Sequence, residues 1–194
     1  MPRSKSTNGN THFTAFGPFE LPFEIAGRGG KTIDRKGIKK KLELVAQQEY
    51  PEQPQVWRKS GLYIFAIRRP GGSTAPYYVG MTRDQALLDE ALENHKLRIY
   101  NEVLANVSGK PILFIIAPTD AGKKAANRAL LEQIEDLLIA RLYEMNEDMR
   151  NKRGKPSKRF VIDGVPLIAS QGGMRRGRRS RAAAEVCKLI RSSE

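Results

Sequence analysis

The stretch that decides the fold is residues 61–80, GLYIFAIRRPGGSTAPYYVG. Its first part, residues 62–67, is rich in the β-branched and aromatic side chains that favour strands. Residues 70–73 supply the proline, glycine and serine typical of a turn, and residues 77–79 return to strand formers. The pattern predicts an antiparallel hairpin that brings Tyr63 and Tyr78 close together, although fifteen positions separate them.

Two further patterns surround this hairpin. Residues 111–116 form a continuous apolar run with a turn on each side, which predicts a strand buried on both faces at the centre of the sheet. The strongest helix is predicted from Lys124 to about Met149, with one apolar face. Glu135 lies at the edge of that face, where a carboxylate is costly to desolvate. Pairing with a neighbouring Lys or Arg and binding of a metal are the two interpretations.

A helix is also predicted between these strands. Asp84 is suited to cap it, with Thr82 and Gln85 at capping-box spacing. His95 falls on its apolar stripe and Arg98 on the shoulder of that stripe. The stripe itself consists of Leu88, Leu92, Ile99 and Val103.

The two ends of the chain give weaker patterns. Residues 12–25 predict two short extended pieces, and residues 32–48 predict a helix with a lysine cluster. A solvated face is the first interpretation of that cluster, and contact with a DNA backbone is the second. A short strand is expected at residues 160–162, followed by a small helix with Ala183, Val186 and Ile190 on one side.

The charge of the chain is strongly positive. Its 34 Lys and Arg residues outnumber 21 acids, which gives a net charge of +13. Residues 151–194 alone hold twelve Lys or Arg against three acids, a net +9. A solubilising tail is one interpretation, and a partner that is a polyanion, such as nucleic acid, is the other.

Several functional classes lack their motifs. The chain has no H-E-x-x-H, C-x-x-C or G-x-S-x-G, and only two histidines, so zinc chemistry and histidine-dependent triads are not expected. The single Cys187 permits no internal disulfide, which fits a reducing compartment. No membrane span or apolar leader is visible, and we expect a cytoplasmic protein.

The order of elements over residues 61–151 resembles the GIY-YIG nuclease family. Residues 61–63, GLY, match its first signature element and residues 78–80, YVG, its second. His95 and Lys96 lie where the family carries basic helix residues, as in a bacterial branch with YVGxT followed by a longer helix containing His-Lys. Residues 135–139, EDLLI, resemble the metal-binding E-x-x-L-I segment, and Asn151 the polar residue that closes the module.

The resemblance implies an α+β fold with a small three-stranded antiparallel sheet flanked by helices. Residues 56–151 would form the nuclease-like domain. Residues 1–55 would form a disordered N-terminus with a helical and extended elaboration, and residues 152–194 a basic extension. The nucleic-acid contacts expected in that extension are Lys152, Arg153, Arg175, Arg176, Arg178 and Arg179.

The activity implied is hydrolysis of DNA phosphodiester bonds with Mg²⁺ or Mn²⁺. Tyr63 would be the general base, its pKa lowered by nearby cations, and Tyr78 would position the phosphate. Glu135 would hold the metal, and Asn151 would support the site by hydrogen bonds. The basic role is shared among His95, Lys96 and Arg98, with the first two preferred if the bacterial branch is the right one.

Two other classes stay open. One is a non-catalytic nucleic-acid-binding protein on the same scaffold. The other is a structural RNA-binding protein that uses its arginine-rich end. RNA therefore stays an alternative partner to DNA. An enzyme that cuts both strands with one site per chain would be expected to act as a homodimer.

Overall fold

The chain forms a mixed α+β fold in the computed structural model, which describes residues 12–25, 31–33, 35–49, 58, 60–82, 85–118, 127–151, 161–162, 185–186 and 188–189. Its elements in order are β1 (His12–Glu20), β2 (Phe23–Ile25), β3 (Lys31–Ile33), α1 (Arg35–Glu49), β4 (Leu62–Arg68), β5 (Thr74–Met81), α2 (Leu87–Ala91), α3 (Asn94–Asn106), β6 (Lys110–Pro118), α4 (Arg128–Met145) and β7 (Val161–Ile162).

The main sheet has the strand order β5-β4-β6-β1-β7. Its first four strands are antiparallel neighbours, and the two-residue β7 runs parallel to β1. The three strands expected from residues 61–118 are present as β5-β4-β6, but the sheet is larger than predicted because β1 and β7 extend it. β2 and β3 form a separate two-stranded sheet.

The predicted hairpin is confirmed. Tyr63 pairs with Gly80 and Phe65 with Tyr78 across β4 and β5. Thr82 closes the open end, since its backbone N–H donates to the Gly61 carbonyl and its hydroxyl accepts from the Gly61 N–H, each at 2.9 Å. Thr82 is therefore tied to the hairpin rather than to a helix cap, and the predicted cap Asp84 lies outside the described residues.

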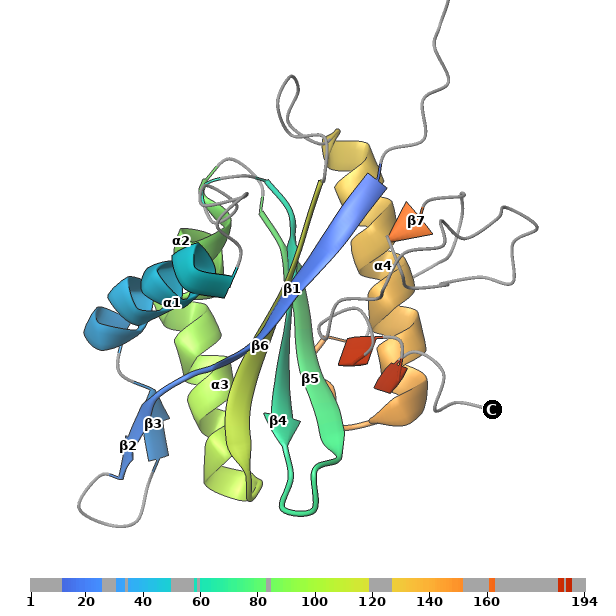
Figure 1. Ribbon diagram of the computed structural model, residues 1–194. Helices are drawn as coiled ribbons and strands as arrows, with labels where there is room; N and C mark the ends of the chain where they lie inside the picture. The colour runs from blue at the N-terminus through green and yellow to red at the C-terminus, as the bar shows by residue number, and fades with distance from the viewer. Residues whose placement is uncertain are drawn as a thin grey trace, which may run out of the picture.

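The sheet is covered by different helices on its two faces (Figure 1). Alternation along β4 sends Leu62, Ile64 and Ala66 into a core with α4, and Tyr63 and Phe65 into a core with α2 and α3. The strand β6 contributes buried residues to both cores, as expected for a central strand with a continuous apolar sequence.

The helix α4 begins at its cap, where the Asn127 side chain accepts a hydrogen bond from the Ala129 N–H at 3.0 Å. It ends at Met145, four residues before the predicted end, because Asn146 turns extended and donates from its side chain to the Pro76 carbonyl. Met149 is nevertheless buried beside the helix. Lys124, the predicted start, lies outside the described residues.

The terminal segments join the same structure. Thr32, predicted as the helix start, lies in β3, and α1 follows it. Val186 and Leu189 are buried in the core beside α4, and Glu185 forms an ion pair with Arg68 at 2.7 Å. Ile190, predicted on the buried side with Val186, lies outside the described residues.

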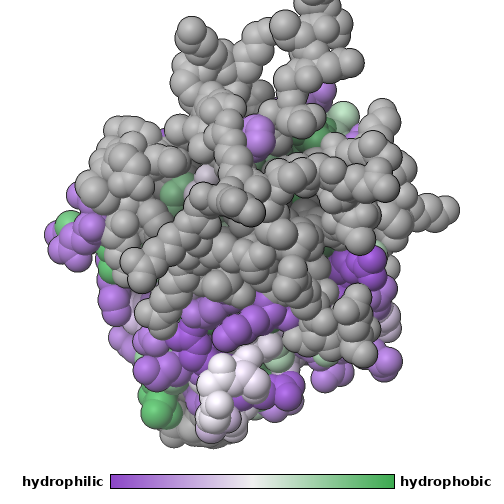
Figure 2. All heavy atoms as spheres, turned by 45° about the vertical axis from the view of Figure 1, so that its right-hand side comes forward, coloured by the Kyte–Doolittle hydropathy of each residue, from purple (hydrophilic) through white to green (hydrophobic). Residues whose placement is uncertain are grey.

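The described surface is largely polar. In Figure 2 the described residues that reach this face are mostly hydrophilic. Ile25 and Leu44 are the large hydrophobic side chains exposed among the described residues. None of the helices in the described ranges combines the length and apolar character needed to cross a membrane.

Candidate functional site

Tyr63 and Tyr78 lie close together, as predicted. Both point to the face of the sheet covered by α2 and α3, with ring centroids 6.2 Å apart and an interplanar angle of 24°. Tyr78 stands directly opposite Phe65 in the strand pairing, so it is the diagonal neighbour of Tyr63. The hairpin register therefore determines the spacing of the two phenols.

Gly80 makes room for the Tyr63 side chain. A Cβ added at Gly80 would lie 2.3 Å from the Tyr63 hydroxyl and 2.4 Å from the carbon that bears it. The Tyr63 ring thus extends across its strand neighbour to β5, the edge strand of the sheet. Glycine is needed at the end of the YVG segment for a steric reason, because any side chain at this position would displace the Tyr63 phenol.

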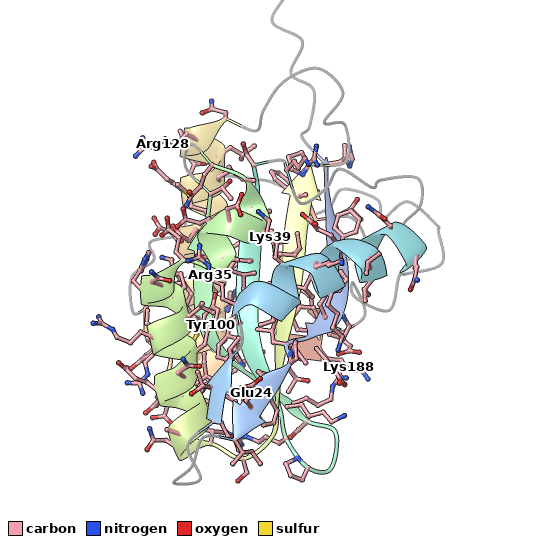
Figure 3. All side chains as sticks on the ribbon, turned by 90° about the vertical axis from the view of Figure 1, so that its left-hand side faces the viewer. Glu24, Arg35, Lys39, Tyr100, Arg128 and Lys188 are labelled. Atoms are coloured by element: carbon pink, nitrogen blue, oxygen red, sulfur yellow. The ribbon has the colours of Figure 1, made fainter. Side chains whose placement is uncertain are left out.

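A third tyrosine, which the sequence patterns missed, completes the cluster. Tyr100 lies on α3 where the helix faces the sheet (Figure 3). Its ring stacks on Phe65 at 4.0 Å between centroids and meets Tyr78 edge-on at 6.4 Å. Its place three positions before Val103 on the helix stripe could have indicated its burial.

Two of these hydroxyls are buried without a hydrogen-bond partner. Among the residues that the structure describes, neither the Tyr63 nor the Tyr100 hydroxyl has one. Burial raises the pKa of Tyr63 well above its usual value, and the influence of Tyr100, Tyr78, Glu90 and Glu135 raises it further. Burial also raises the pKa of Tyr100. The expected lowering of the Tyr63 pKa by cations is therefore wrong for this arrangement.

Lys96 is the basic residue that reaches the tyrosines. Its Nζ donates a hydrogen bond to the Tyr78 hydroxyl at 2.8 Å and lies 5.0 Å from the centre of that ring. The side chain is 11% exposed. A buried ammonium in contact with a phenol is well placed to add a phosphate oxygen as a further ligand.

His95 and Arg98 lie on the outside of α3. The His95 side chain is 54% exposed with its Nδ1 3.1 Å from Glu93, and the Arg98 side chain is 79% exposed and lies 4.0 Å from Glu102. The prediction that His95 lies on the apolar stripe assumes one continuous helix and is wrong. The helix instead breaks at residues 92–93 into α2 and α3, which rotates the buried face to Lys96, Leu97, Tyr100, Val103 and Leu104.

Glu90, on α2, is a second residue that sequence reasoning missed. Its carboxylate lies 3.7 Å from Lys96 Nζ and accepts a hydrogen bond from Gln85 at 2.7 Å. The side chain is 14% exposed. Its position three residues after the buried Leu87 was the available signal, because i and i+3 share a helix face.

Glu135 lies on α4 and is partly buried, as its place at the edge of the apolar face predicted. The core that α4 forms with the sheet and the core that contains Tyr63 lie on opposite faces of the sheet. The helix α4 also contacts the edge strand β5, which carries Tyr78.

Asn151 and Asn146 both bind the outer edge of β5. The Asn151 side chain accepts from the Val79 N–H at 3.2 Å and donates to the Val79 carbonyl. Between the two asparagines, the Arg150 N–H donates to the Tyr77 carbonyl at 2.9 Å. These bonds satisfy an edge strand that would otherwise expose its backbone, and they hold Tyr78 in place.

The described residues offer no metal site built from several protein ligands. They include no group of three or more His, Cys, Asp or Glu side chains able to hold an ion. A structural zinc site therefore does not fit these residues, whereas Mg²⁺ keeps several waters and accepts one protein carboxylate. Glu135, a partly buried carboxylate on α4, is the candidate for a single protein ligand of that kind.

The predicted contacts in the basic extension lie outside the described residues. They are Lys152, Arg153, Arg175, Arg176, Arg178 and Arg179. The described helix α1 carries a basic surface. Its Arg35 side chain donates a hydrogen bond to Asn94 at 2.9 Å, and its Lys39 lies 2.5 Å from Asp89 (Figure 3). This helix is thereby attached beside α2 and α3, next to the tyrosine cluster.

Comparison with known proteins gives no relative. No protein-family model matches the chain, and neither a curated protein nor a solved structure matches it significantly.

Proposed function

We propose that the chain is a metal-dependent endonuclease of the GIY-YIG type that hydrolyses phosphodiester bonds in DNA. The observation that carries the proposal is the convergence of Tyr63, Tyr78 and Lys96, residues spread over three elements, beside the Val79–Asn151 pairing. The strands β5-β4-β6 with α3 and α4 would correspond to the three-stranded sheet and helices of that family.

Lys96 and Tyr78 would bind the substrate. The Lys96 ammonium would neutralise charge on a non-bridging phosphate oxygen, and the Tyr78 hydroxyl that it contacts would orient the same group. Both side chains come from separate elements fixed by packing, which favours a preorganised site.

Tyr63 would orient the attacking water. Its raised pKa keeps the phenol protonated, so its hydroxyl acts first as a hydrogen-bonding group. The water oxygen bonds to phosphorus and gives up one proton to the solvent, while the bond to the 3′-oxygen breaks and the leaving oxygen takes up one proton from the solvent. A role for Tyr63 as general base requires added positive charge beside the hydroxyl to lower its pKa.

Glu135 would hold Mg²⁺ or Mn²⁺, and the bound ion supplies positive charge to the developing oxyanions. The basic protein would gain the sequence-independent part of its DNA affinity from phosphate contacts. RNA is an alternative substrate of the same chemistry, and a homodimer would place two sites on a duplex.

A second candidate is a nucleic-acid-binding protein without catalysis. The observation that favours it is the complete burial of Tyr63 together with its raised pKa. On this alternative the tyrosines serve packing, and the basic surface alone contacts the partner.

A cleavage assay distinguishes the two candidates. Supercoiled plasmid and single-stranded DNA are incubated with and without Mg²⁺, using the wild type, Glu135→Ala and the control Glu132→Ala. Glu132 lies on the same helix but is exposed and pairs with Arg128 at 2.9 Å. The nuclease proposal requires cutting that depends on Mg²⁺, is lost in Glu135→Ala and is kept in Glu132→Ala. Binding without cutting by the wild type would favour the second candidate.

A further inference from the structure

A line of polar contacts leads from the surface of α2 to the tyrosine cluster. The Gln85 side-chain N–H₂ donates to Glu90 Oε2 and to Glu93 Oε1, each at 2.7 Å. The other oxygen of Glu90 lies 3.7 Å from Lys96 Nζ, which in turn donates to the Tyr78 hydroxyl at 2.8 Å. Glu90 therefore stands between the exposed Gln85 and the lysine of the proposed site.

Lys96 and Glu90 are both largely buried, so the ion pair between them matters for the position of Lys96. A buried ammonium is stable only with a nearby opposite charge, and the Glu90 carboxylate is the partner that the ion pairs of the described residues give to Lys96. A lysine stem is flexible and can turn its head to water when that is favoured. Without Glu90, the Lys96 ammonium would lose the carboxylate that holds it beside the Tyr78 hydroxyl.

We infer that Glu90 is a positioning residue, held by Gln85, that keeps the Lys96 ammonium on the Tyr78 hydroxyl. Its consequence for cleavage rests on the proposed function, but the positioning of Lys96 does not.

The adjacent acid on α2 provides a matched control. Asp89 also carries one negative charge and also pairs with a lysine, Lys39, at 2.5 Å. That pair is exposed and joins α2 to α1. Asp89→Asn therefore changes the net charge as Glu90→Gln does, while leaving Lys96 with its partner.

The first measurement needs no enzymatic activity. Full-length protein is labelled briefly with acetic anhydride, and the modification of each lysine is followed by mass spectrometry. Lys96 should be labelled at least several-fold faster in Glu90→Gln than in the wild type, and at the wild-type rate in Asp89→Asn. Gln85→Ala, a change at an exposed residue, should raise the rate in the same direction by a smaller factor.

The second measurement separates positioning from a general structural effect. In Glu90→Gln, kcat for plasmid cleavage should fall roughly 10- to 100-fold, because the hydrogen bond from the Lys96 ammonium to the Tyr78 hydroxyl is lost. Affinity for a 20-mer oligonucleotide should change less than kcat, since the loss of a negative charge beside the phosphate site offsets part of the binding lost with the displaced ammonium. Asp89→Asn should keep the wild-type kcat.

The outcomes are distinct. Unchanged labelling of Lys96 in folded Glu90→Gln and Gln85→Ala overturns the inference, whatever happens to cleavage. Equal acceleration at all lysines, with lost circular dichroism, in Glu90→Gln but no change in Gln85→Ala also overturns it. Selective acceleration of Lys96 labelling in Glu90→Gln, together with a wild type that cuts no substrate, supports the positioning and overturns the proposed function.

Discussion

The two faces of the sheet differ in chemistry. The core beside α4 consists of aliphatic side chains with two phenylalanines and two methionines, and each of its members is apolar. The core beside α2 and α3 has Tyr63, Tyr77 and Tyr100 among its members, and Lys96 is buried at its margin. An unpartnered buried hydroxyl costs stability, so the first face stabilises the fold and the second carries polar groups that stability alone does not explain.

The largest effect is expected from a truncation on the apolar face. Leu138→Ala removes a fully buried side chain of α4 and should lower the free energy of unfolding by about 2–5 kcal/mol in chemical denaturation. Cleavage per folded molecule should largely persist, because the tyrosine cluster lies on the other face and the Glu135 carboxylate is kept. The exposed Leu44 is the control, and Leu44→Ala should cost less than about 0.5 kcal/mol. Equal losses at the two positions would remove the basis of the comparison.

A smaller effect on stability is expected where the tyrosine face meets the edge strand. Gly80→Ala places a Cβ against the Tyr63 ring and should destabilise by about 1–3 kcal/mol through overpacking. Unlike Leu138→Ala, it should also abolish cleavage, because the phenol must move. The matched change Gly71→Ala adds a side chain in open space at a positive φ, so its cost is confined to backbone strain. Wild-type cleavage by Gly80→Ala would show that the position of Tyr63 is not needed.

The alkaline pH dependence sharpens the comparison further. Tyr63 and Tyr100 keep their protons in the folded state, whereas tyrosines in the unfolded chain ionise near pH 10. Above about pH 10 the unfolded state therefore binds fewer protons than the folded state. The contribution of each tyrosine to the free energy of unfolding is fully present below about pH 10 and falls above it by about 1.4 kcal/mol per pH unit. Denaturation of the wild type and Tyr100→Phe between about pH 9 and 11 isolates one phenol. Identical slopes for the two proteins would contradict the raised pKa of Tyr100.

Local patterns predicted much of the fold. The hairpin, the central strand and the apolar face of α4 were all evident, because each depends on neighbours in the sequence or on one hydrophobic period. The extension of the sheet by β1 was missed, since its pairing with β6 joins segments about a hundred positions apart. Its two-residue partner β7 coincides with the short strand expected at residues 160–162.

The candidate site was predictable in part. The proximity of Tyr63 and Tyr78 followed from the hairpin, and Lys96 was one of three candidate cations. The break between α2 and α3 could not be predicted from helix periodicity, and it decides that Lys96 rather than His95 points inward. The environment of Tyr63 could not be predicted, because its burial sets the direction of its pKa shift and a motif does not report burial.

The most direct test of the account is Tyr63→Phe, measured for stability and for Mg²⁺-dependent cleavage on the same preparation. Removal of a buried hydroxyl without a described partner should raise the free energy of unfolding by about 1 kcal/mol, and loss of the group that orients water should abolish cutting. A protein that is more stable and inactive is the predicted result. Cleavage at the wild-type rate, or a clear loss of stability, would contradict the claim that the buried Tyr63 hydroxyl destabilises the fold but is needed for cleavage.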